Sequence, residues 1–228
     1  MSQPPIQLPF SDKYTQTHAQ AYLDKHRDGL ARRLSHQRDL QLARKALRLA
    51  GEPTLVLDLP CGAGRFWPLL AEQPNRVILA ADNSADMLAT ARASQPSNIV
   101  ARVRTFQTSA FAIDLPDRSV DSIFCMRLMH HIGESAHRMP MLREFHRVTR
   151  DTVILSLWVD GNYKAWKRRR LEAERDRHLG RGLQNRFVIP AHQIESEFAG
   201  AGFTILGHFD FLPLYAMWRV YVLRRGDR

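Results

Sequence analysis

The residues best suited to bind a ligand begin with two glycines that follow a short apolar run. Residues 54–66 read T-L-V-L-D-L-P-C-G-A-G-R-F, so that Gly62 and Gly64 follow a run that ends at Asp58. A buried strand that leads through a glycine turn into a helix begins a doubly wound α/β sheet. Glycine allows close approach to the backbone, and the helix N-terminus offers unpaired N–H groups. The stretch predicts a turn that binds a carboxylate or phosphate, unless its glycines serve packing alone.

A carboxylate follows the glycine turn at a spacing of some twenty residues. Asp82 ends the expected second strand, 76–82, which reads R-V-I-L-A-A-D. An acidic residue at this place is suited to bind a ribose, because one carboxylate can accept hydrogens from two hydroxyl groups. The alternative is that Asp82 caps the next helix, although Ser84 is the better candidate for that role. We therefore predict a ribose contact at Asp82.

A basic cluster follows the apolar run 120–126, which is typical of a strand buried on both faces. It contains Arg127, His130 and His131. Histidine titrates near neutral pH, so either ring is a candidate to accept a proton from an acceptor hydroxyl. Arg127 is a candidate to bind an acidic group of a substrate. The alternative for either histidine is a packing role.

These segments together resemble the class I S-adenosylmethionine-dependent methyltransferases. D-L-P-C-G-A-G-R-F, 58–66, is similar to motif I of that family, D-x-G-x-G-x-G, with Pro60 in place of the first glycine. D-N-S-A-D-M-L, 82–88, is similar to the motif D-x-S-x-x-M-L. Q-T-S-A-F-A-I-D-L-P-D-R-S-V-D, 107–121, resembles the segment written G-D-A-x-x-L-P-F-P-D-x-S-F-D. The resemblance is closer in the cofactor half of the chain than in the acceptor half.

The resemblance implies S-adenosyl-L-methionine as cofactor. Its methionine part would lie at the glycine turn, where Pro60 fits only if that position needs a negative φ and no N–H donor. Ser109 stands where the family usually has an adenine-binding Asp, and the Ala110 N–H would make the neighbouring contact. The residues placed at the cofactor are Asp58, Pro60, Cys61, Gly62, Gly64, Asp82, Asn83, Met87, Ser109, Ala110 and Met126.

The acceptor side follows from the same resemblance. The family places the end of strand four between methyl donor and acceptor, which makes His130 or His131 the catalytic candidate. A basic insertion, 160–190, is either a lid that binds an acidic group through arginine or a solvated helix with pairs such as Arg168–Glu172. Arg177 and Arg181, at a spacing of four residues, are candidates to clamp a nucleotide or a cyclic dinucleotide. The substrate-binding candidates are Arg127, Tyr14, Tyr22, Trp166, Arg177 and Arg181.

The whole chain is basic and poor in cysteine. Its 228 residues carry a formal net charge of +10, which indicates an acidic partner such as nucleic acid, a phosphorylated glycan or an anionic membrane, or simply a soluble surface. Cys61 and Cys125 are spaced neither for a metal site nor for a disulfide framework, which favours a reducing, cytoplasmic setting. The N-terminus does not resemble a signal peptide, and the apolar run 211–223 is too short to span a bilayer.

The elements that must position these residues can be read along the chain. We expect a flexible segment 1–11 and one methyltransferase domain, 12–228. The resemblance implies an α/β fold with a doubly wound, mostly parallel seven-stranded sheet and an antiparallel last strand. The expected helices are 12–49 with an interruption at Gly29, 64–73, 136–149, 163–178 and 191–199. The expected strands beyond the first two are 98–106, 120–126, 152–158, 204–206 and 217–223.

The resulting hypothesis is a methyltransferase that uses S-adenosylmethionine. Its acceptor would be a small molecule, lipid or glycan, and the basic insertion favours one that is acidic or phosphorylated. Such a reaction mainly requires that nucleophile and methyl group be held in line and that water be excluded. Two alternatives stay open. One is an RNA methyltransferase, and the other is a nucleotide-binding regulatory protein that keeps the fold without turnover.

Overall fold

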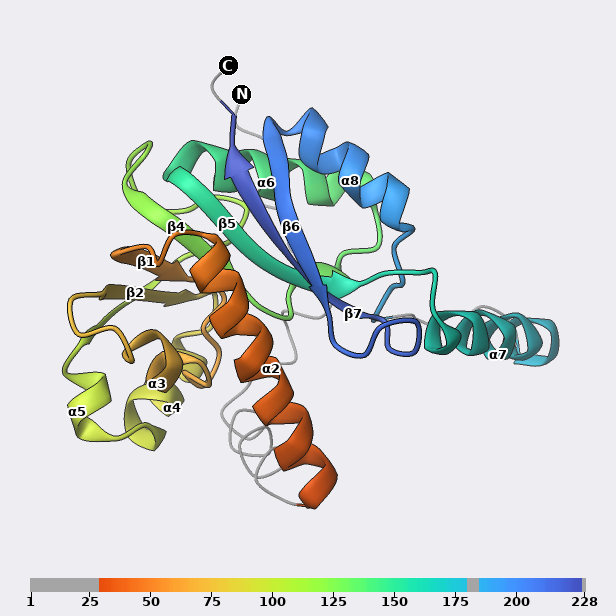
Figure 1. Cartoon of the computed structure of the whole chain (residues 1–228), viewed down its shortest axis with the longest axis horizontal. Coiled ribbons are helices and arrows are strands. Elements are labelled where there is room, and N and C mark those ends of the chain that lie inside the picture. The colour runs from red at the N-terminus through yellow and green to blue at the C-terminus, as the bar shows by residue number, and fades with distance from the viewer. Residues whose placement is uncertain (1–28, 180–184, 227–228) are drawn as a thin grey trace.

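The structure, a computed structural model, describes residues 29–179 and 185–226, apart from the side chains of Leu30 and residues 175–179. Its centre is a seven-stranded sheet of order β3-β2-β1-β4-β5-β7-β6 (Figure 1). Strands β1 to β5 pair in parallel, whereas β7 runs antiparallel to both β5 and β6. The predicted doubly wound sheet with an antiparallel last strand is thus confirmed. The strands are β1 (Leu55–Asp58), β2 (Val77–Asp82), β3 (Val103–Gln107), β4 (Val120–Cys125), β5 (Thr149–Trp158), β6 (Phe203–Asp210) and β7 (Trp218–Arg225).

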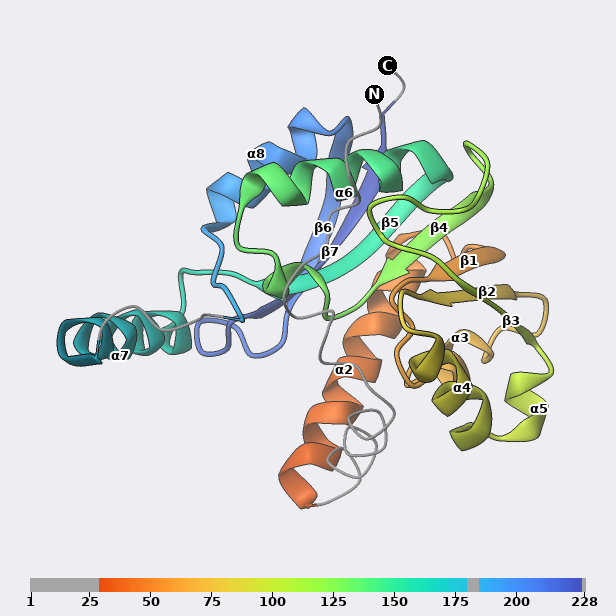
Figure 2. The same ribbon diagram turned by 180° about the vertical axis from the view of Figure 1, so that it is seen from behind.

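Helices cover both faces of the sheet. On one face α2 (Leu30–Leu49) lies across the strands with α3 (Trp67–Leu70) beside it, and on the other lie α6 (Ser135–Val148) and α8 (Ala191–Gly200) (Figures 1 and 2). The shorter α4 (Ala85–Ser94) and α5 (Ser97–Val100) flank the β2–β3 end. A 3-10 turn, η2 (Met129–His131), follows β4.

Alternation of side chains along the strands builds the two halves of the core. In β4 the buried Phe124 joins the cluster that contains Leu42 of α2, while its neighbours Ile123 and Cys125 join the cluster that contains Phe145 of α6. Successive residues of a strand point to opposite faces, so a strand covered on both sides must be apolar throughout. Each large apolar side chain buried in this way contributes about 1.5–3 kcal/mol. The core therefore fixes the sheet edge on which the candidate site lies.

Two predicted elements differ from those observed. The expected strand 98–106 is instead α5 followed by β3, because the carbonyl of Pro96 accepts the N–H groups of Ile99 and Val100 and closes a helical turn. A short apolar run does not by itself distinguish a strand from a helical turn. The expected helix 64–73 is reduced to the four residues of α3, since Gly64 has a φ of 70° and cannot begin a helix. The expected N-terminal helix begins at Leu30 within the described residues, directly after Gly29 with a φ of 94°.

The insertion after β5 forms a helix, as predicted. This helix, α7 (Tyr163–Leu179), projects sideways from the sheet (Figure 1). Its first turn is held by backbone bonds in which the N–H groups of Tyr163 and Lys164 donate to the carbonyls of Leu214 and Tyr215, at 2.9 and 3.0 Å. Within the residues described, no helix is both long and apolar enough to cross a membrane.

Candidate functional site

The predicted cofactor residues gather at the carboxyl ends of β1 and β2. In the sheet order β1 lies between β2 and β4, and Asp58 at its end pairs in register with Ala80 and Phe124. The strand order reverses between β1 and β4, and a crevice at such a switch point is where open α/β sheets bind their ligands. Asp58, the glycine turn and Asp82 all lie at this edge.

The glycine turn has the backbone geometry that its sequence predicts. Gly62 and Gly64 both adopt left-handed conformations, with φ values of 53° and 70°. A Cβ atom on Gly64 would lie 2.8 Å from the ring of the fully buried Trp67, so this position requires glycine for space as well as for conformation. The Gly64 N–H donates to the Cys61 carbonyl at 3.0 Å and closes the turn.

Pro60 fits the turn. The peptide bond between Leu59 and Pro60 is cis, and Pro60 does not have a positive φ. The N–H groups on either side are used, since Leu59 donates to Phe124 O at 3.0 Å and Cys61 donates to Ala81 O at 2.9 Å. The turn is thus anchored to β4 and β2 without needing a donor at position 60.

Asp82 is bound into the glycine turn from the neighbouring strand. Its side chain is buried, with Oδ2 accepting the Gly62 N–H and Oδ1 accepting the Ser84 N–H, both at 3.0 Å. Burial raises the pKa of Asp82, and these N–H donors act in the opposite direction. Each carboxylate oxygen has a second lone pair, so the group keeps capacity to accept ribose hydroxyls. Ser84, not Asp82, is the N-cap of α4, because its hydroxyl accepts the Met87 N–H at 3.3 Å.

Asp58 places a second carboxyl group beside Asp82. It is 1% exposed, and its Oδ2 makes no hydrogen bond of good geometry within the described part of the chain, although the side-chain N–H of Trp67 lies near enough to act against the rise in its pKa. Burial, and then the charge of Asp82, hold the pKa of Asp58 well above its usual range. Buried polar atoms normally have partners, so this oxygen is suited to receive a donor from a ligand or water. The ammonium group of an amino-acid moiety lying at the turn is such a donor.

The predicted adenine residues lie on the far side of Asp82. Met87 is buried, and its Cε lies 3.5 Å from where a Cβ on Gly62 would be. Ser109 uses its hydroxyl locally, accepting the Phe111 N–H at 3.2 Å, whereas the Ala110 N–H has no bond to a described residue. Asn83 is exposed, and its carbonyl accepts from Gln107 Nε2 at 2.8 Å. Ala110 therefore keeps the free donor that an adenine contact requires.

The two histidines on the acceptor side differ in environment. His130 is 3% exposed, packs between Trp158 and Trp218 at ring distances of 5.0 and 4.7 Å, and its Nδ1 has no partner among the described residues. Burial lowers the pKa of His130 to about 2, with His131 and nearby arginines contributing. His131 is only partly buried, and its Nδ1 lies 2.6 Å from the Asn185 carbonyl. Burial also lowers the pKa of His131, which that carbonyl partly counteracts. His131 is thus the better placed of the two to meet a substrate.

An ion-pair cluster that the sequence does not reveal connects α2 to both parts of the site. Asp39 of α2 accepts from Arg65 of the glycine turn at 2.6 Å and from Arg127 at the end of β4 at 2.5 Å. Arg65 Nε also lies 3.0 Å from His36 Nδ1. Arg127 has a φ of 66°, a strained conformation for a residue with a side chain, of the kind that concentrates at functional sites. Nothing in the spacing of these residues predicts the contact, because Asp39 reaches its partners only once α2 crosses the sheet.

Aromatic rings and arginines surround the histidines. The guanidinium of Arg127 lies 4.7 Å from the ring centre of Trp218, and those of Arg168 and Arg186 lie 4.9 and 5.9 Å from Trp158. Such contacts with aromatic faces hold the cations in place. Arg168 also pairs with Glu172, as predicted for the α7 helix, whereas Arg186 forms no ion pair with a described residue.

Other predicted substrate residues do not join this group. Trp166 lies on the exposed side of α7, where it contacts Tyr163 and Arg170 instead of the histidines. The tryptophans that line the site are Trp158 and Trp218, which face each other across the β5–β7 pair. Three predicted residues, Tyr14, Tyr22 and Arg181, lie outside the described residues, as does the side chain of Arg177.

Comparison with known proteins identifies a domain in the first half of the sheet. Residues 56–152 match a family model described as a methyltransferase domain. Two uncharacterised methyltransferase-like proteins of Schizosaccharomyces pombe are 30% and 33% identical over 109 and 107 residues, or 48% and 46% of this chain. The matched region spans 39% of the length of each of these relatives.

Solved structures share the fold over nearly the whole chain. The magnesium protoporphyrin IX methyltransferase of Synechocystis PCC 6803, solved with bound S-adenosylhomocysteine, superposes with a TM-score of 0.76 at 16% identity, covering 95% of this chain and 98% of that one. The cyclase SpnF superposes with a TM-score of 0.59 at 16% identity, covering 81% of each chain. The second protein is named for a different reaction, so the shared fold does not by itself assign the chemistry.

Proposed function

We infer that residues 56–152 are a methyltransferase domain of the class I, S-adenosylmethionine-dependent type. On this premise, we propose that the chain methylates an acidic or phosphorylated small molecule, lipid or glycan. The observation that carries the proposal is the hydrogen bond between the glycine turn and the end of β2. The buried Asp82 accepts the N–H of Gly62 at 3.0 Å, within a turn in which Gly62 and Gly64 are both left-handed. Two buried, unpaired cysteines, Cys61 and Cys125, support the cytoplasmic location proposed with it.

The residues at the sheet edge fit S-adenosylmethionine. The Asp58 carboxyl group would accept from its ammonium group, Asp82 would hold the ribose hydroxyls and the Ala110 N–H would meet the adenine. When bound, this cofactor supplies a sulfonium methyl group that a nucleophile displaces in line. The chain's part is to align the acceptor and keep water out, which the bridge from Asp39 to Arg65 and Arg127 supports by holding α2 near the turn.

The charges on the acceptor side favour an anionic substrate. Three arginines, Arg127, Arg168 and Arg186, lie against the rings of Trp218 and Trp158, and Arg65 is joined to Arg127 through Asp39. The ion pairs of these four arginines contain two carboxylates, Asp39 and Glu172. An excess of guanidinium groups in a partly desolvated site attracts and orients carboxylate or phosphate groups. A carboxylate or phosphate oxygen has no proton to lose when it accepts a methyl group, so the weakly basic His130 would not be needed. His131 would serve only an acceptor that carries a hydroxyl.

Calorimetry with S-adenosylmethionine and S-adenosylhomocysteine tests the cofactor part of this proposal. We expect saturable binding of both, and we expect Asp82→Asn to weaken it by about 1.5–3 kcal/mol, the range for a hydrogen bond to a charged group. The exposed Asp86, four residues further on, provides the matched control Asp86→Asn, which should bind as the unmodified chain does. Failure of either ligand to bind at millimolar concentration would contradict the proposal.

Transfer of a labelled methyl group tests the chemistry separately. Incubation with labelled cofactor and pools of acidic metabolites, phosphorylated glycans, lipids and RNA should label the acidic small-molecule, lipid or glycan fraction. Label in RNA, with binding that weakens steeply as salt increases, would support the RNA alternative instead. Binding without label in any pool would support a regulatory protein that keeps the fold.

A further inference from the structure

An exposed apolar surface lies at the outer end of the molecule, far along the chain from the cofactor residues. It is formed by α7 and the connection between β6 and β7, and we name it the tip surface. Leu214 is 82% exposed and Trp166 57% exposed, which is unusual for side chains of this size. The residues of the tip surface are Tyr163, Trp166, Leu171, Leu212, Leu214 and Tyr215.

Contacts among its own residues hold the tip surface in place. The rings of Tyr163 and Tyr215 stack at 5.8 Å, and Trp166 lies 5.9 Å from Tyr163. Backbone bonds from Tyr163 and Lys164 to the carbonyls of Leu214 and Tyr215 join the helix to the connection. Leu214 has a φ of 62°, which a branched side chain adopts only at a cost. A strained turn that exposes a leucine to solvent indicates that this leucine contacts another molecule.

Two lysines of α7 flank the apolar residues, and neither pairs with an acidic residue among those described. Three arginines of α7 form ion pairs, with Asp160, Glu172 and Glu174. Lys164 and Lys167 are exposed and form no ion pair with any residue that the structure describes. The ammonium group of Lys164 lies 5.4 Å from the ring centre of Tyr215, directly at the tip surface. The free charge on this part of α7 is therefore positive.

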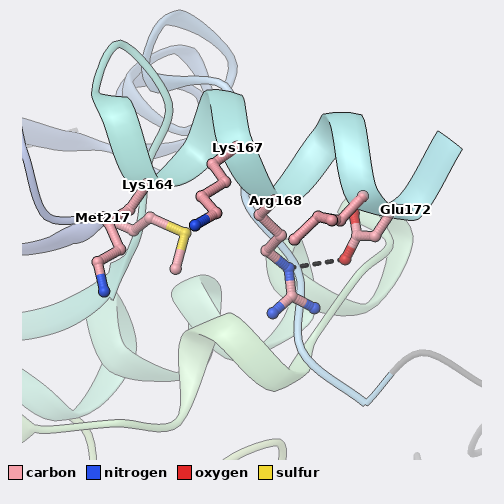
Figure 3. A pocket seen from close by; sticks show the side chains of 6 residues that line it. Lys164, Lys167, Arg168, Glu172 and Met217 are labelled. Atoms are coloured by element: carbon pink, nitrogen blue, oxygen red, sulfur yellow. Dashed lines mark ion pairs between the residues drawn. The ribbon is translucent and has the colours of Figure 1, made fainter. Parts of the chain in front are cut away.

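A shallow groove of about 400 Å³ runs along the same helix (Figure 3). Lys164, Lys167 and Arg168 line it together with the apolar Leu171 and Met217 and with Glu172, which pairs with Arg168. Figure 3 shows the side chains of Lys167 and Met217 close together on the same side of the helix. Because Glu172 pairs with Arg168, the two lysines provide the unpaired charge of the groove, beside apolar side chains. Such a groove complements a molecule that carries an anionic group next to hydrocarbon.

We propose that the tip surface docks onto an anionic lipid bilayer. Tryptophan and tyrosine favour the membrane–water interface, leucine enters the acyl boundary and lysine is attracted to anionic headgroups. The tip surface combines all three on a helix that projects from the body (Figure 1). Nucleic acid fits less well, because Leu212 and Leu214 cannot stack on bases and gain nothing from a phosphate backbone. The proposal does not depend on methyl transfer.

Sedimentation with lipid vesicles tests the proposal on the full chain. We expect the chain to pellet with vesicles of 70% phosphatidylcholine and 30% phosphatidylglycerol and to stay in solution with phosphatidylcholine alone. Leu214→Asn keeps a residue that tolerates a positive φ while removing the apolar group. Lys164→Glu with Lys167→Glu reverses the charge. The charge reversal should weaken binding about tenfold or more, given roughly a kilocalorie per mole for each basic residue at the surface. Leu214→Asn should weaken it about tenfold or more because an apolar side chain no longer leaves water.

Matched changes on α2 separate the tip surface from general charge and hydrophobicity. Leu34 is 62% exposed, and Arg33 and Lys45 are exposed on the same helix. Leu34→Gln removes a similarly exposed leucine, and Arg33→Glu with Lys45→Glu reverses the same amount of charge. For both we expect vesicle binding to stay within about twofold of the unmodified chain. Equal losses from the α2 and α7 changes would overturn the assignment to the tip surface.

Tryptophan fluorescence provides a readout that is specific for the tip. Trp67 and Trp158 are buried and Trp218 is partly buried, whereas Trp166 is exposed, so insertion should shift mainly the emission of Trp166 to shorter wavelength. Trp166→Leu should keep the chain on anionic vesicles and lose that shift. Three results would overturn the proposal. These are no binding to either vesicle, binding to single-stranded RNA that depends on Leu214 in place of vesicle binding, and a dimer in solution that Leu214→Asn dissociates without any vesicle binding.

Discussion

At the scale of single residues, the site depends on positions where only one side chain fits. Gly64 combines a left-handed backbone with contact against the buried ring of Trp67. Asp82 accepts two backbone N–H groups and so shapes the turn that it would share with a ligand. Both residues therefore have a structural role in addition to any role in ligand binding. Their substitution must be judged by folding as well as by affinity.

Substitution of Gly64 by Ala should be more damaging than the same change at Gly51. Both glycines have a positive φ, 70° and 79°, and each should lose about 1–2 kcal/mol through backbone strain. A Cβ at Gly51 has no neighbour within 4 Å, whereas one at Gly64 would collide with Trp67. We expect Gly64→Ala to lose about 1–3 kcal/mol more in the free energy of unfolding, measured by urea denaturation. Equal losses would show that the Trp67 ring moves aside at no cost.

At the scale of elements, the bridge at Asp39 holds α2 against the rest of the site. Asp39 is buried and joins Arg65 and Arg127, which lie in different segments. The contact couples the helix to both the glycine turn and the end of β4. Because α2 is attached beside the glycine turn, its position determines how far the crevice is covered. The Asp39 bridge should therefore influence cofactor affinity.

Replacement of Asp39 by Ala should remove the ion pairs that attach α2 to the glycine turn and to the end of β4. Two guanidinium groups would lose their carboxylate, at an expected cost of about 2–3 kcal/mol in the free energy of unfolding. This is less than the 3–5 kcal/mol of a fully buried pair, because a quarter of the Arg127 side chain is exposed. The exposed pair Asp151–Arg224 gives the control Asp151→Ala, which should cost under about 1 kcal/mol. Hydrogen exchange should show faster opening of α2 in Asp39→Ala alone, and unchanged α2 protection would contradict the role assigned to the bridge.

At the scale of the whole molecule, histidines that are buried or partly buried as neutral rings should make the fold sensitive to acid. Burial lowers the pKa values of His36, His130 and His131 below their ordinary value of 6.5. In the range between the folded and unfolded pKa values, the unfolded chain binds more protons than the folded chain does. The stability that these residues provide is therefore complete above pH 6.5 and decreases as the pH falls below it.

His130 should account for much of this acid sensitivity. Its folded pKa of about 2 predicts a loss of about 2 kcal/mol in the free energy of unfolding between pH 7.5 and pH 5.0. His130→Phe retains a ring between Trp158 and Trp218 and should reduce the loss over that interval by this amount, as measured by urea denaturation at both pH values. The exposed His192 provides the control His192→Gln. An unchanged pH dependence in His130→Phe would show that His130 is not buried as a neutral ring.

Local patterns in the sequence determined the first half of the sheet. The strand with Asp58, the two glycines and the acidic end of β2 are close in the chain, and their backbone preferences act over a few residues. They predicted the turn and the position of Asp82 at the same sheet edge. The same patterns were ambiguous for 98–106, where a proline and a short apolar run permit either a strand or a helical turn.

Only the tertiary structure decided what surrounds the acceptor site. His130, Trp158 and Trp218 are separated by 28 and 60 residues along the chain, and they meet because β7 inserts between β5 and β6 and pairs Trp218 with Trp158. Asp39 meets Arg127 because α2 crosses the sheet. These contacts depend on strand order and helix placement, which are set by burial of the entire core. No short segment carries that information, so the sequence predicted the cofactor edge better than the acceptor site.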